Sequence, residues 1–426
     1  MAALARKLDV IVFGATGFTG KYTVFEGVKI LAGMKWGVAG RNKSKLESTL
    51  EEMGRKAGAD LSHIPIVLAD VDDQPSLVQM ARECNVVVNC CGPYRLYGEQ
   101  VIRACLEAGT HHVDVSGEPQ FLEGMQLKYH DAAKEKGVYL ISACGFDSIP
   151  AEMGTIFLEQ QFGGVVNSVE SYLFTKISGK RELGGIHYGT WASAVHAIAN
   201  LKEVGAIRRE LFKTKMPQLE PKLRNRPIIH KSSGNKWSLP FLGPDKSCVV
   251  RTQRFLYETE NKRPVQMKNY ISFGNLIEML AVSFVGAIFW LLVKTTMGQN
   301  LLLNYPRLFS LGMVSHEGPS DEAMNNVHFT MHFEGRGWEE DLGNPNEKYS
   351  YPPNKVLRTR VSATNPGYGA TCVALLLSAK TILREAERMP GRGGFLTPGA
   401  AFAKTNLISE LCSNGFTFEV VSKAKL

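Results

Sequence analysis

The sequence lacks several patterns that would assign it to a class at once. Its eight cysteines include no Cys-x-x-Cys pair, so we interpret them as reduced thiols rather than as a disulfide framework. It has no low-complexity segment, heptad pattern or long internal repeat, which excludes coiled-coil, collagen-like and solenoid chains. The first apolar run, residues 10–13, is too short for the core of a signal peptide, and we expect none.

What is present is an ordinary globular composition with an uneven charge. The 426 residues suffice for more than one domain, and 44% hydrophobic with 21% charged residues excludes a wholly disordered chain. The formal net charge is +8, but residues 201–270 alone hold sixteen Lys/Arg against six Asp/Glu. Such a basic block indicates a partner surface, and we expect no nucleic acid among the partners.

A short apolar strand, a glycine-rich turn and a helix follow one another near the N-terminus. Residues 8–13 (LDVIVF) are the expected strand, and the helix extends to about Leu31. The turn between them consists of Gly14, Ala15, Thr16, Gly17, Phe18, Thr19 and Gly20. Its glycines allow a sharp bend, close approach of a diphosphate and packing of helix on strand, while the N–H groups at the helix start bind the anion. We therefore predict a dinucleotide site.

The residues after the second strand predict which dinucleotide binds. This strand covers residues 36–39, and Arg41 and Asn42 follow it. An NAD site normally has Asp or Glu here to bind the ribose 2′-hydroxyl, and the sequence has neither. Arg41, with Lys43 or Lys45 nearby, suits a 2′-phosphate instead. We predict NADP(H) in preference to NAD(H); the alternative is a set of solvated charges opening a helix.

Strands and helices continue to alternate up to residue 150. Further strands are expected over residues 64–69, 85–90, 112–115 and 138–143, and helices over residues 74–83, 99–108 and 121–136. Six strands with short crossovers predict an α/β fold, a doubly wound parallel sheet of the Rossmann type that binds ligands beyond the carboxyl ends of its strands. The cofactor site predicted at this edge also includes Asp70, Cys91, Gly92 and Pro93. Asp70 could accept from an adenine amino group or be a solvated turn residue.

Four side chains at the same edge are candidate acid–base groups for hydride transfer. They are Tyr94, Asp114, Glu118 and Asp147. Tyr94 could donate to a carbonyl group. Each carboxylate could equally be a helix cap or a turn anchor, and the residues after Asp147 are typical of a helix start. Residues 327–333 contain two histidines four apart, but their alternation predicts a strand, and we expect no metal.

Six segments together resemble the saccharopine dehydrogenase-like oxidoreductases. They are GATGFTG (14–20), AGRN (39–42), NCCGPY (89–94), HVDVSGE (112–118), ACGFDSIP (143–150) and GGFLTPGAAF (393–402). Their order and spacing carry the resemblance, which runs to the last predicted helix. It implies a nicotinamide cofactor and an inserted substrate domain, with C-terminal elements that complete the cofactor domain. The sequence is also similar to bacterial reductases of lipid-linked enoyl groups, so the substrate is not fixed.

From this resemblance we expect three regions. An NADP-binding domain would cover residues 1–150 and an α+β domain for substrate or dimerisation residues 151–390. A C-terminal helix and strand within residues 391–426 would pack back on the first domain, and a homodimer is a further expectation.

Short-chain dehydrogenases offer a rival interpretation because they begin with the same glycine pattern. They need Tyr and Lys four positions apart on a helix, and Tyr172 and Lys176 have that spacing. Residues 168–177 alternate like a strand, however, on which such a pair is about 13 Å apart. We therefore prefer the first interpretation to this alternative.

The apolar run of residues 276–293 has three interpretations. It contains a single charge, Glu278, and its length is borderline for a bilayer span. A span would separate the C-terminal segment from the nucleotide domain, whereas a buried core or dimer helix needs no membrane. A monotopic segment would lie in a lipid surface while the basic block meets anionic head groups. We favour the third and predict a lipid surface contact through residues 201–293.

The preferred function is an NADP(H)-dependent oxidoreductase acting on a hydrophobic or lipid-linked substrate at the cytosolic face of a lipid droplet or membrane. One alternative is a saccharopine reductase of lysine metabolism, whose dicarboxylate pocket the arginines of residues 201–270 would have to supply. Another is a non-catalytic nucleotide-binding protein of a lipid surface. The C-terminal Ala424-Lys425-Leu426 resembles a peroxisomal address, so a peroxisome is an alternative location, as is a mitochondrion.

Overall fold

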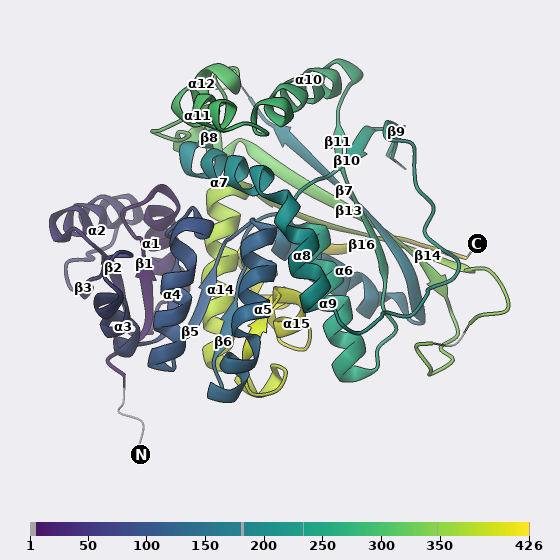
Figure 1. The fold of residues 1–426 in the computed structure, drawn as a ribbon, viewed down its shortest axis with the longest axis horizontal. Coiled ribbons are helices and arrows are strands. Elements are labelled where there is room, and N and C mark those ends of the chain that lie inside the picture. Colours follow the sequence, from purple (N-terminus) through teal and green to yellow (C-terminus); the bar gives the residue numbers. More distant parts are fainter. Residues whose placement is uncertain (1–5, 180–182, 233, 347, 426) are drawn as a thin grey trace.

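Two seven-stranded sheets form the framework of the computed structural model (Figure 1), which describes residues 6–179, 183–232, 234–346 and 348–425. The first sheet is wholly parallel. Its strands lie in the order β15 (Gly394–Leu396), β6 (Tyr139–Ile141), β5 (His111–Asp114), β4 (Cys84–Asn89), β1 (Leu8–Phe13), β2 (Trp36–Gly40) and β3 (Ile66–Leu68). The second sheet is mixed, in the order β16 (Thr417–Lys425), β14 (Lys355–Thr364), β13 (Val327–Trp338), β7 (Val165–Ile177), β11 (Gln266–Phe273), β10 (Trp237–Pro240) and β9 (His230–Lys231).

Helices cover the first sheet because each parallel connection needs a crossover. They are α1 (Phe18–Ile30), α2 (Lys43–Ala57), α3 (Gln74–Glu83), α4 (Tyr94–Ala108), α5 (Pro119–Lys136), α6 (Ser148–Phe162) and α14 (Thr371–Arg384). Asn42 and Asp73 cap the starts of α2 and α3, since their carbonyl or carboxylate oxygens accept from the N–H groups of Lys45 and Ser76. The predicted doubly wound sheet is confirmed.

The start of α4 differs from the prediction. The sequence pattern begins the helix at Glu99, whereas α4 begins at Tyr94. The N–H groups of Tyr94 and Arg95 each donate to the Glu118 carboxylate at 3.0 Å. Glu118 is buried in the loop after β5, so the group that satisfies this helix start lies far along the chain. A cap at that separation leaves no local sequence signal.

Helix α6 joins the two sheets into one core. It follows β6 of the first sheet and packs on β13 and β14 of the second. A Cβ at Gly154 would lie 2.4 Å from the Phe333 ring, so the absence of a side chain permits this close approach. Phe333 and Val361 are buried at this contact, and one hydrophobic cluster extends across both sheets.

The C-terminal segment divides between the two sheets. β15 pairs in parallel with β6, and α14, which lies in the part of the chain expected to form the second region, packs against α1, β4 and β5 of the first. β16 instead pairs antiparallel with β14, which corrects the expectation that the last strand packs on the first domain. The reason is that β14 offers unpaired backbone groups along its outer edge. Ala424 and Lys425 are paired within this strand, and Leu426 lies outside the described residues.

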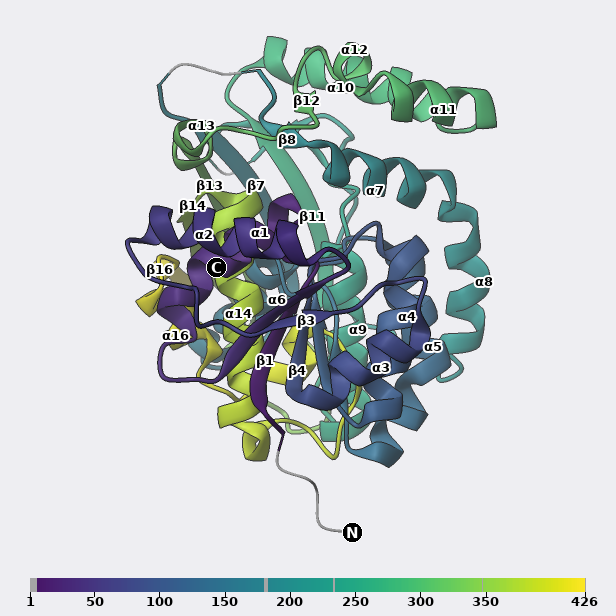
Figure 2. The ribbon, with the colours of Figure 1, turned by 90° about the vertical axis from the view of Figure 1, so that its left-hand side faces the viewer.

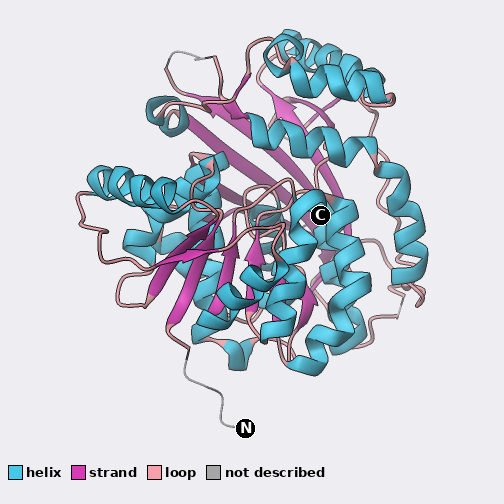
Figure 3. Cartoon of the chain, turned by 60° about the vertical axis from the view of Figure 1, so that its left-hand side comes forward, coloured by secondary structure: helices cyan, strands magenta, loops and turns pink. Residues whose placement is uncertain are grey.

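A layer of helices covers one end of the molecule (Figures 2 and 3). Its members are α7 (Tyr188–Ala199), α10 (Leu276–Leu292), α11 (Thr296–Asn304) and α12 (Pro306–Phe309). Pro306 begins α12. α10 lies wholly within the described residues, and Met279 is its one buried residue, so the interpretation of residues 276–293 as a core helix of the monomer is wrong. The neighbours of α10 in the described part of the chain include β10, β11 and α11.

One helical segment in the described part of the chain is long and apolar enough to cross a membrane by length and composition. It covers residues 366–384, which include α14, and 78% of it is buried inside the protein. α10 is shorter, with 17 residues.

Candidate cofactor and acid–base site

The turn between β1 and α1 presents an open backbone at the edge of the first sheet. Gly14 has a φ of +77°, which glycine adopts without strain. A Cβ at Gly20 would lie 2.1 Å from the Gly14 carbonyl oxygen, so only glycine allows this packing of helix on strand. Gly17 is exposed and precedes α1, whose first turn contains no acidic residue. The N–H groups and the helix dipole fit a diphosphate group here.

Three loops at the ends of β2, β3 and β4 bring Arg41, Asp70 and Cys91 together. Burial raises the pKa of the Cys91 thiol to about 11, while the nearby charges of Arg41 and Asp70 respectively lower and raise it. Arg41 is exposed, and its guanidinium fits a phosphate on the ribose. The Asn42 side chain is used to cap α2. We therefore limit its predicted part in the cofactor site to its backbone.

The Phe18 ring anchors the glycine turn to the second half of the chain. It stacks on His187, with ring centroids 4.9 Å apart, and meets Tyr368 edge-on at 4.6 Å. The N–H group of His187 donates to the Tyr368 hydroxyl at 3.0 Å. A Cβ at Gly318 would lie 2.4 Å from the Phe18 ring. The backbone of Phe18 thus forms part of the glycine turn, and its side chain packs on the second half of the chain.

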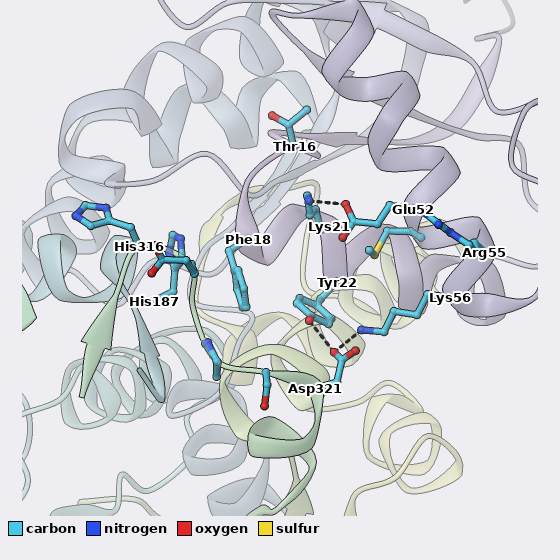
Figure 4. A pocket seen from close by; sticks show the side chains of 14 residues that line it. Thr16, Phe18, Lys21, Tyr22, Glu52, Arg55, Lys56, His187, His316 and Asp321 are labelled. Carbon is cyan, nitrogen blue, oxygen red and sulfur yellow. Dashed lines mark hydrogen bonds and ion pairs between the residues drawn. The ribbon is translucent and has the colours of Figure 1, made fainter. Parts of the chain in front are cut away.

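A cavity of about 650 Å³ opens beside this anchor (Figure 4). Thr16 and Phe18 of the glycine turn form part of its wall, together with α1, α2 and a loop that ends at Asp321. The Asp321 carboxylate accepts from the Tyr22 hydroxyl at 2.7 Å and pairs with the Lys56 ammonium. These bonds hold α1 and α2 against the second half of the chain.

Two of the four acid–base candidates form hydrogen bonds with backbone groups. The buried Tyr94 hydroxyl donates to the Asn89 carbonyl at 2.9 Å and accepts from the Val115 N–H group at 3.4 Å. The Glu118 carboxylate accepts the two N–H groups at the start of α4. Burial raises the pKa of Glu118, which those hydrogen bonds counteract. Both side chains therefore shape the sheet edge, and we do not carry them into the proposal below.

Asp114 is likewise a buried anchor between β5 and β6. Its carboxylate accepts from the Ser142 hydroxyl at 2.7 Å and from the N–H groups of Ser116 and Ala143 at 2.9 and 3.3 Å. Burial raises the pKa of Asp114 to about 6 in spite of these hydrogen bonds. Burial also lowers the pKa of the neighbouring His112 to about 3, so that imidazole is neutral at physiological pH.

Asp147 differs from the other three candidates. It is the N-cap residue of α6 but, within the described part of the chain, its side chain caps no N–H group. Its φ of 75° and ψ of −71° are unusual for a residue other than glycine, and such strain tends to occur at functional sites. The side chain is partly exposed, and burial raises its pKa to about 7. Of the four candidates, Asp147 is therefore the one whose side chain is not held by hydrogen bonds to the backbone in the described part of the chain.

The structure brings further residues to this edge that had no clear sequence signal. Asp245 begins α9 (Asp245–Glu260), which packs on α6. Thr371 begins α14, and its hydroxyl accepts from the Phe146 N–H group at 3.0 Å. Tyr368 precedes it in a Gly-Tyr-Gly segment. Proline and glycine turns predict loops here but not which loop they will contact.

No metal site emerges from the residues that the structure describes: no group of three or more His, Cys, Asp or Glu side chains is placed to hold an ion. The two histidines of residues 327–333 lie on strand β13, as their alternation predicts. Tyr172 and Lys176 also lie on a strand, β7, so they are not the helical pair that the rival interpretation needs.

Comparison with known proteins gives matches over part and over all of the chain. Residues 10–141 match the family model described as the saccharopine dehydrogenase NADP binding domain. The human protein named saccharopine dehydrogenase-like oxidoreductase is 40% identical over 435 residues, covering 100% of both chains. A protein of Caenorhabditis elegans named lipid droplet localized protein is 36% identical and covers 99% of this chain and 100% of its own.

A solved structure agrees with the fold. Apo histidine-tagged saccharopine dehydrogenase (L-Glu forming) from Saccharomyces cerevisiae superimposes with a TM-score of 0.52 over 97% of this chain and 100% of its own. The sequence identity is 11%, so this likeness concerns the fold alone.

Proposed function

Because this chain belongs to the family of saccharopine dehydrogenase-like oxidoreductases, we propose that it transfers hydride between NADP(H) and a hydrophobic substrate held at a lipid surface. The family resemblance and NADP(H) as the cofactor are confirmed by the full-length relatives and by the matched domain. NADPH, when bound, supplies the hydride ion, and the protein positions the cofactor and the proton-transfer group. The substrate class and the lipid surface are our proposal.

The coenzyme assignment can be tested at Arg41. A guanidinium paired with a 2′-phosphate contributes about 1.5–3 kcal/mol as a charged hydrogen bond, or roughly 10- to 100-fold in affinity. We expect Arg41→Asp to weaken NADPH binding by that factor and to reverse the preference towards NADH. Fluorescence titration with both coenzymes measures this. Arg103→Asp, at an exposed arginine in the second half of α4, is the matched control; unchanged selectivity in Arg41→Asp would contradict the assignment.

The observation that carries the lipid surface is an exposed apolar stripe on α10. Its members are Ile277, Leu280, Phe284, Ile288 and Leu291. They recur every three or four positions and so lie on one face of the helix. Ile277, Phe284 and Leu291 are 80%, 67% and 66% exposed. Burying three such side chains from water is worth several kcal/mol, at about 1.5–3 kcal/mol each.

The opposite face of α10 connects this stripe to the cofactor edge. Phe289 meets the Trp191 ring of α7 at a centroid distance of 4.9 Å, and the Trp191 indole N–H donates to the Leu302 carbonyl of α11 at 2.8 Å. On its other side α7 approaches the loop after β5, where His196 acts electrostatically on Glu118. One helix therefore separates the stripe from the sheet edge, which suits a substrate that arrives from lipid.

The charges near α10 favour a lipid head-group region. Lys294 follows the helix, and its ammonium lies 5.3 Å from the Trp290 ring centroid, while Arg307 lies on α12. Tryptophan beside a cation is typical of an interfacial segment. The basic block of residues 201–270 contributes less than its net charge indicates. Several of its cations are used in ion pairs: Arg208 with Glu123, Arg226 with Glu170, Arg254 with Glu258 and Lys262 with Glu159.

These ion pairs also weigh against the saccharopine reductase alternative. That alternative needs arginines free to bind a dicarboxylate. Arg208 and Arg226 are each held by two hydrogen bonds to a carboxylate, and Arg251 is buried with its Nε donating to Gln126 at 2.6 Å. We therefore favour an uncharged, hydrophobic substrate.

Flotation with vesicles tests the lipid surface. Wild-type protein should float with phosphatidylcholine vesicles, and more strongly when phosphatidylserine is added. Replacing Ile277, Phe284 and Leu291 together by Ser should reduce the bound fraction more than tenfold. The matched control replaces three exposed apolar side chains elsewhere, Leu68, Leu127 and Val421, and should float like the wild type. Equal loss in both variants, or no wild-type binding, would overturn the proposed surface.

Oxidation of NADPH by a panel of acceptors tests the substrate class. We expect turnover with long-chain carbonyl or enoyl compounds and none with saccharopine. Turnover with saccharopine would support the lysine-pathway alternative. NADPH binding without oxidation by any acceptor would favour the non-catalytic alternative.

A further inference from the structure

A second carboxyl group, from the second half of the chain, lies near enough to Asp147 for the charge of Asp147 to act on it. Asp245 is the first residue of α9 and is 1% exposed. The first turns of α6 and α9 meet here, since the Cys248 thiol donates to the Ser148 hydroxyl at 3.6 Å. Pro244 lies against the loop after β5, 3.7 Å from where a Cβ on Gly117 would stand. The two carboxyl groups therefore share the boundary between the nucleotide sheet and α9.

The Asp245 carboxyl group is buried and lacks hydrogen bonds to other described residues. Neither of its side-chain oxygens has a hydrogen-bond partner on another of the residues that the structure describes. A buried carboxylate in that situation is costly, and proteins usually avoid the cost by keeping the group protonated. Burial and the charge of Asp147 both raise the pKa of Asp245. Asp147 in turn is the partly exposed member of the pair.

The pair nevertheless suits one negative charge. Each carboxyl group stands at the N-terminus of a long helix, α6 or α9, whose dipole favours an anion. Two adjacent carboxylates cannot both ionise easily, because the second charge is repelled by the first. If the two groups share one proton and carry one negative charge, the helix dipoles stabilise that charge and there is no second charge to repel it.

Among the residues that the structure describes, no cation acts on Asp147 or Asp245 strongly enough to lower the pKa of either group. On α6, Glu152 accepts from the Thr252 hydroxyl at 2.7 Å and from the Gly399 N–H group at 2.6 Å, and burial raises its pKa to about 7. On α9, Cys248 is a buried thiol whose pKa burial raises to about 12. Arg251 is the nearby cation, and its Nε is bonded to Gln126.

We propose that Asp147 and Asp245 form a proton-sharing carboxyl pair, in which Asp147 is the acid–base group of the cofactor crevice and Asp245 is a positioning residue that sets its proton affinity. This inference rests on the proposed oxidoreductase function and adds the proton-transfer group to it. In the direction of reduction, NADPH is oxidised to NADP⁺ as a hydride ion passes to one atom of the substrate double bond. The electron pair of that bond moves to the second atom, which takes the proton from Asp147. The pair then regains a proton from solvent, and oxidation reverses each step.

The charge of the nicotinamide ring allows a test that needs no substrate. The ring is positively charged in NADP⁺ and neutral in NADPH, whereas the phosphates are the same. A shared proton beside that ring should be expelled by NADP⁺ and kept with NADPH. Isothermal titration calorimetry in two buffers of different ionisation enthalpy at pH 8 measures the protons released. We expect NADP⁺ to release about half a proton or more beyond NADPH, since phosphate contributions cancel in the difference.

Isosteric variants decide the role of Asp245. In Asp245→Asn the remaining Asp147 loses its repelling neighbour. Burial alone gives it a pKa of about 7, so it is mostly ionised at pH 8, and the difference in proton release at that pH should vanish while both coenzymes still bind. Asp147→Asn carries the same expectation and keeps the test available if Asp245→Asn does not fold. Glu258→Gln, an exposed carboxylate on the same helix, should leave the difference unchanged.

The outcomes separate this inference from the proposed function. If neither coenzyme binds the wild type, the proposed function fails. If both bind with equal proton release, or if Asp245→Asn keeps the wild-type difference, the carboxyl pair is overturned and the oxidoreductase assignment is unaffected.

Discussion

Two apolar helices of this protein, α14 and α10, have opposite surroundings. Residues 366–384, which include α14, have a mean hydropathy of 1.2 and are 78% buried. α10 is apolar apart from Glu278 and Ser283, yet it buries Met279 alone among its residues. α14 is enclosed by α1, by β4 and β5 and by α16 (Leu407–Ser413), whereas α10 contacts its neighbours on one side. Hydropathy predicts that both helices avoid water, and the fold decides that only one of them is covered by protein.

The difference in burial between the two helices indicates which of them presents a surface for a partner. A fully enclosed helix has its apolar surface satisfied within the chain and implies nothing outside it. A stripe of exposed apolar side chains along one helix exceeds the scattered exposure that monomeric proteins tolerate and marks an interaction surface. α14 therefore stabilises the folded chain, whereas the exposed stripe of α10 is free to bind a partner.

The sharpest test of this comparison truncates one leucine in each helix. Leu376 of α14 is 0% exposed, and Leu291 of α10 is 66% exposed. Removing a buried leucine leaves a cavity and costs about 2–5 kcal/mol, so Leu376→Ala should lower the free energy of unfolding by that amount. Leu291→Ala should change it by less than about 0.5 kcal/mol. Denaturant unfolding without lipid measures both.

The alternative result has a definite meaning. If Leu291→Ala costs as much as Leu376→Ala, the α10 stripe is already covered by protein, as a second copy of the chain would do. Repeating the measurement at tenfold lower protein concentration distinguishes the cases, because a dimer contact makes stability depend on concentration.

The first sheet could be predicted from the sequence because its signals are local. Short β-branched runs, glycine turns and amphipathic helices alternate within a few residues, and β1, α3 and the turn at Gly14–Gly20 lie where expected. The start of α4 and the sheet to which β16 belongs could not be predicted in this way. Both are set by partners far along the chain, Glu118 for α4 and β14 for β16.

The same distinction between local signals and contacts with distant residues applies to the candidate site. The glycine turn and Arg41 could be proposed from the sequence because backbone freedom and charge are properties of those residues themselves. Tyr94, Asp114, Glu118 and Asp147 look alike in sequence as polar residues after strands. Their hydrogen bonds distinguish them, and Asp245, which faces Asp147, lies about a hundred residues further along the chain.

The enclosure of α14 has an electrostatic consequence that α10 cannot have. α14 packs over the ends of β4 and β5 and so helps to keep water from Asp114. Burial raises the pKa of that carboxyl group to about 6, above its unfolded value near 4. An acid with a raised pKa in the folded state costs stability once it must ionise. This contribution to stability is therefore most favourable below about pH 4 and is lost as the pH rises through about 6.

Asp114→Asn should remove that pH dependence with a smaller effect than the leucine truncation. The amide oxygen can accept the N–H groups of Ser116 and Ala143, and the amide nitrogen can donate to the Ser142 hydroxyl, so the hydrogen bonds have substitutes. Relative to the wild type, the variant should gain about 1–3 kcal/mol in free energy of unfolding between pH 4.5 and pH 7.5. Denaturant unfolding at the two pH values measures this, and the other buried acids cancel in the difference. A constant offset between the two proteins would mean that Asp114 ionises as it does in water, and that the enclosure by α14 does not reach the sheet edge.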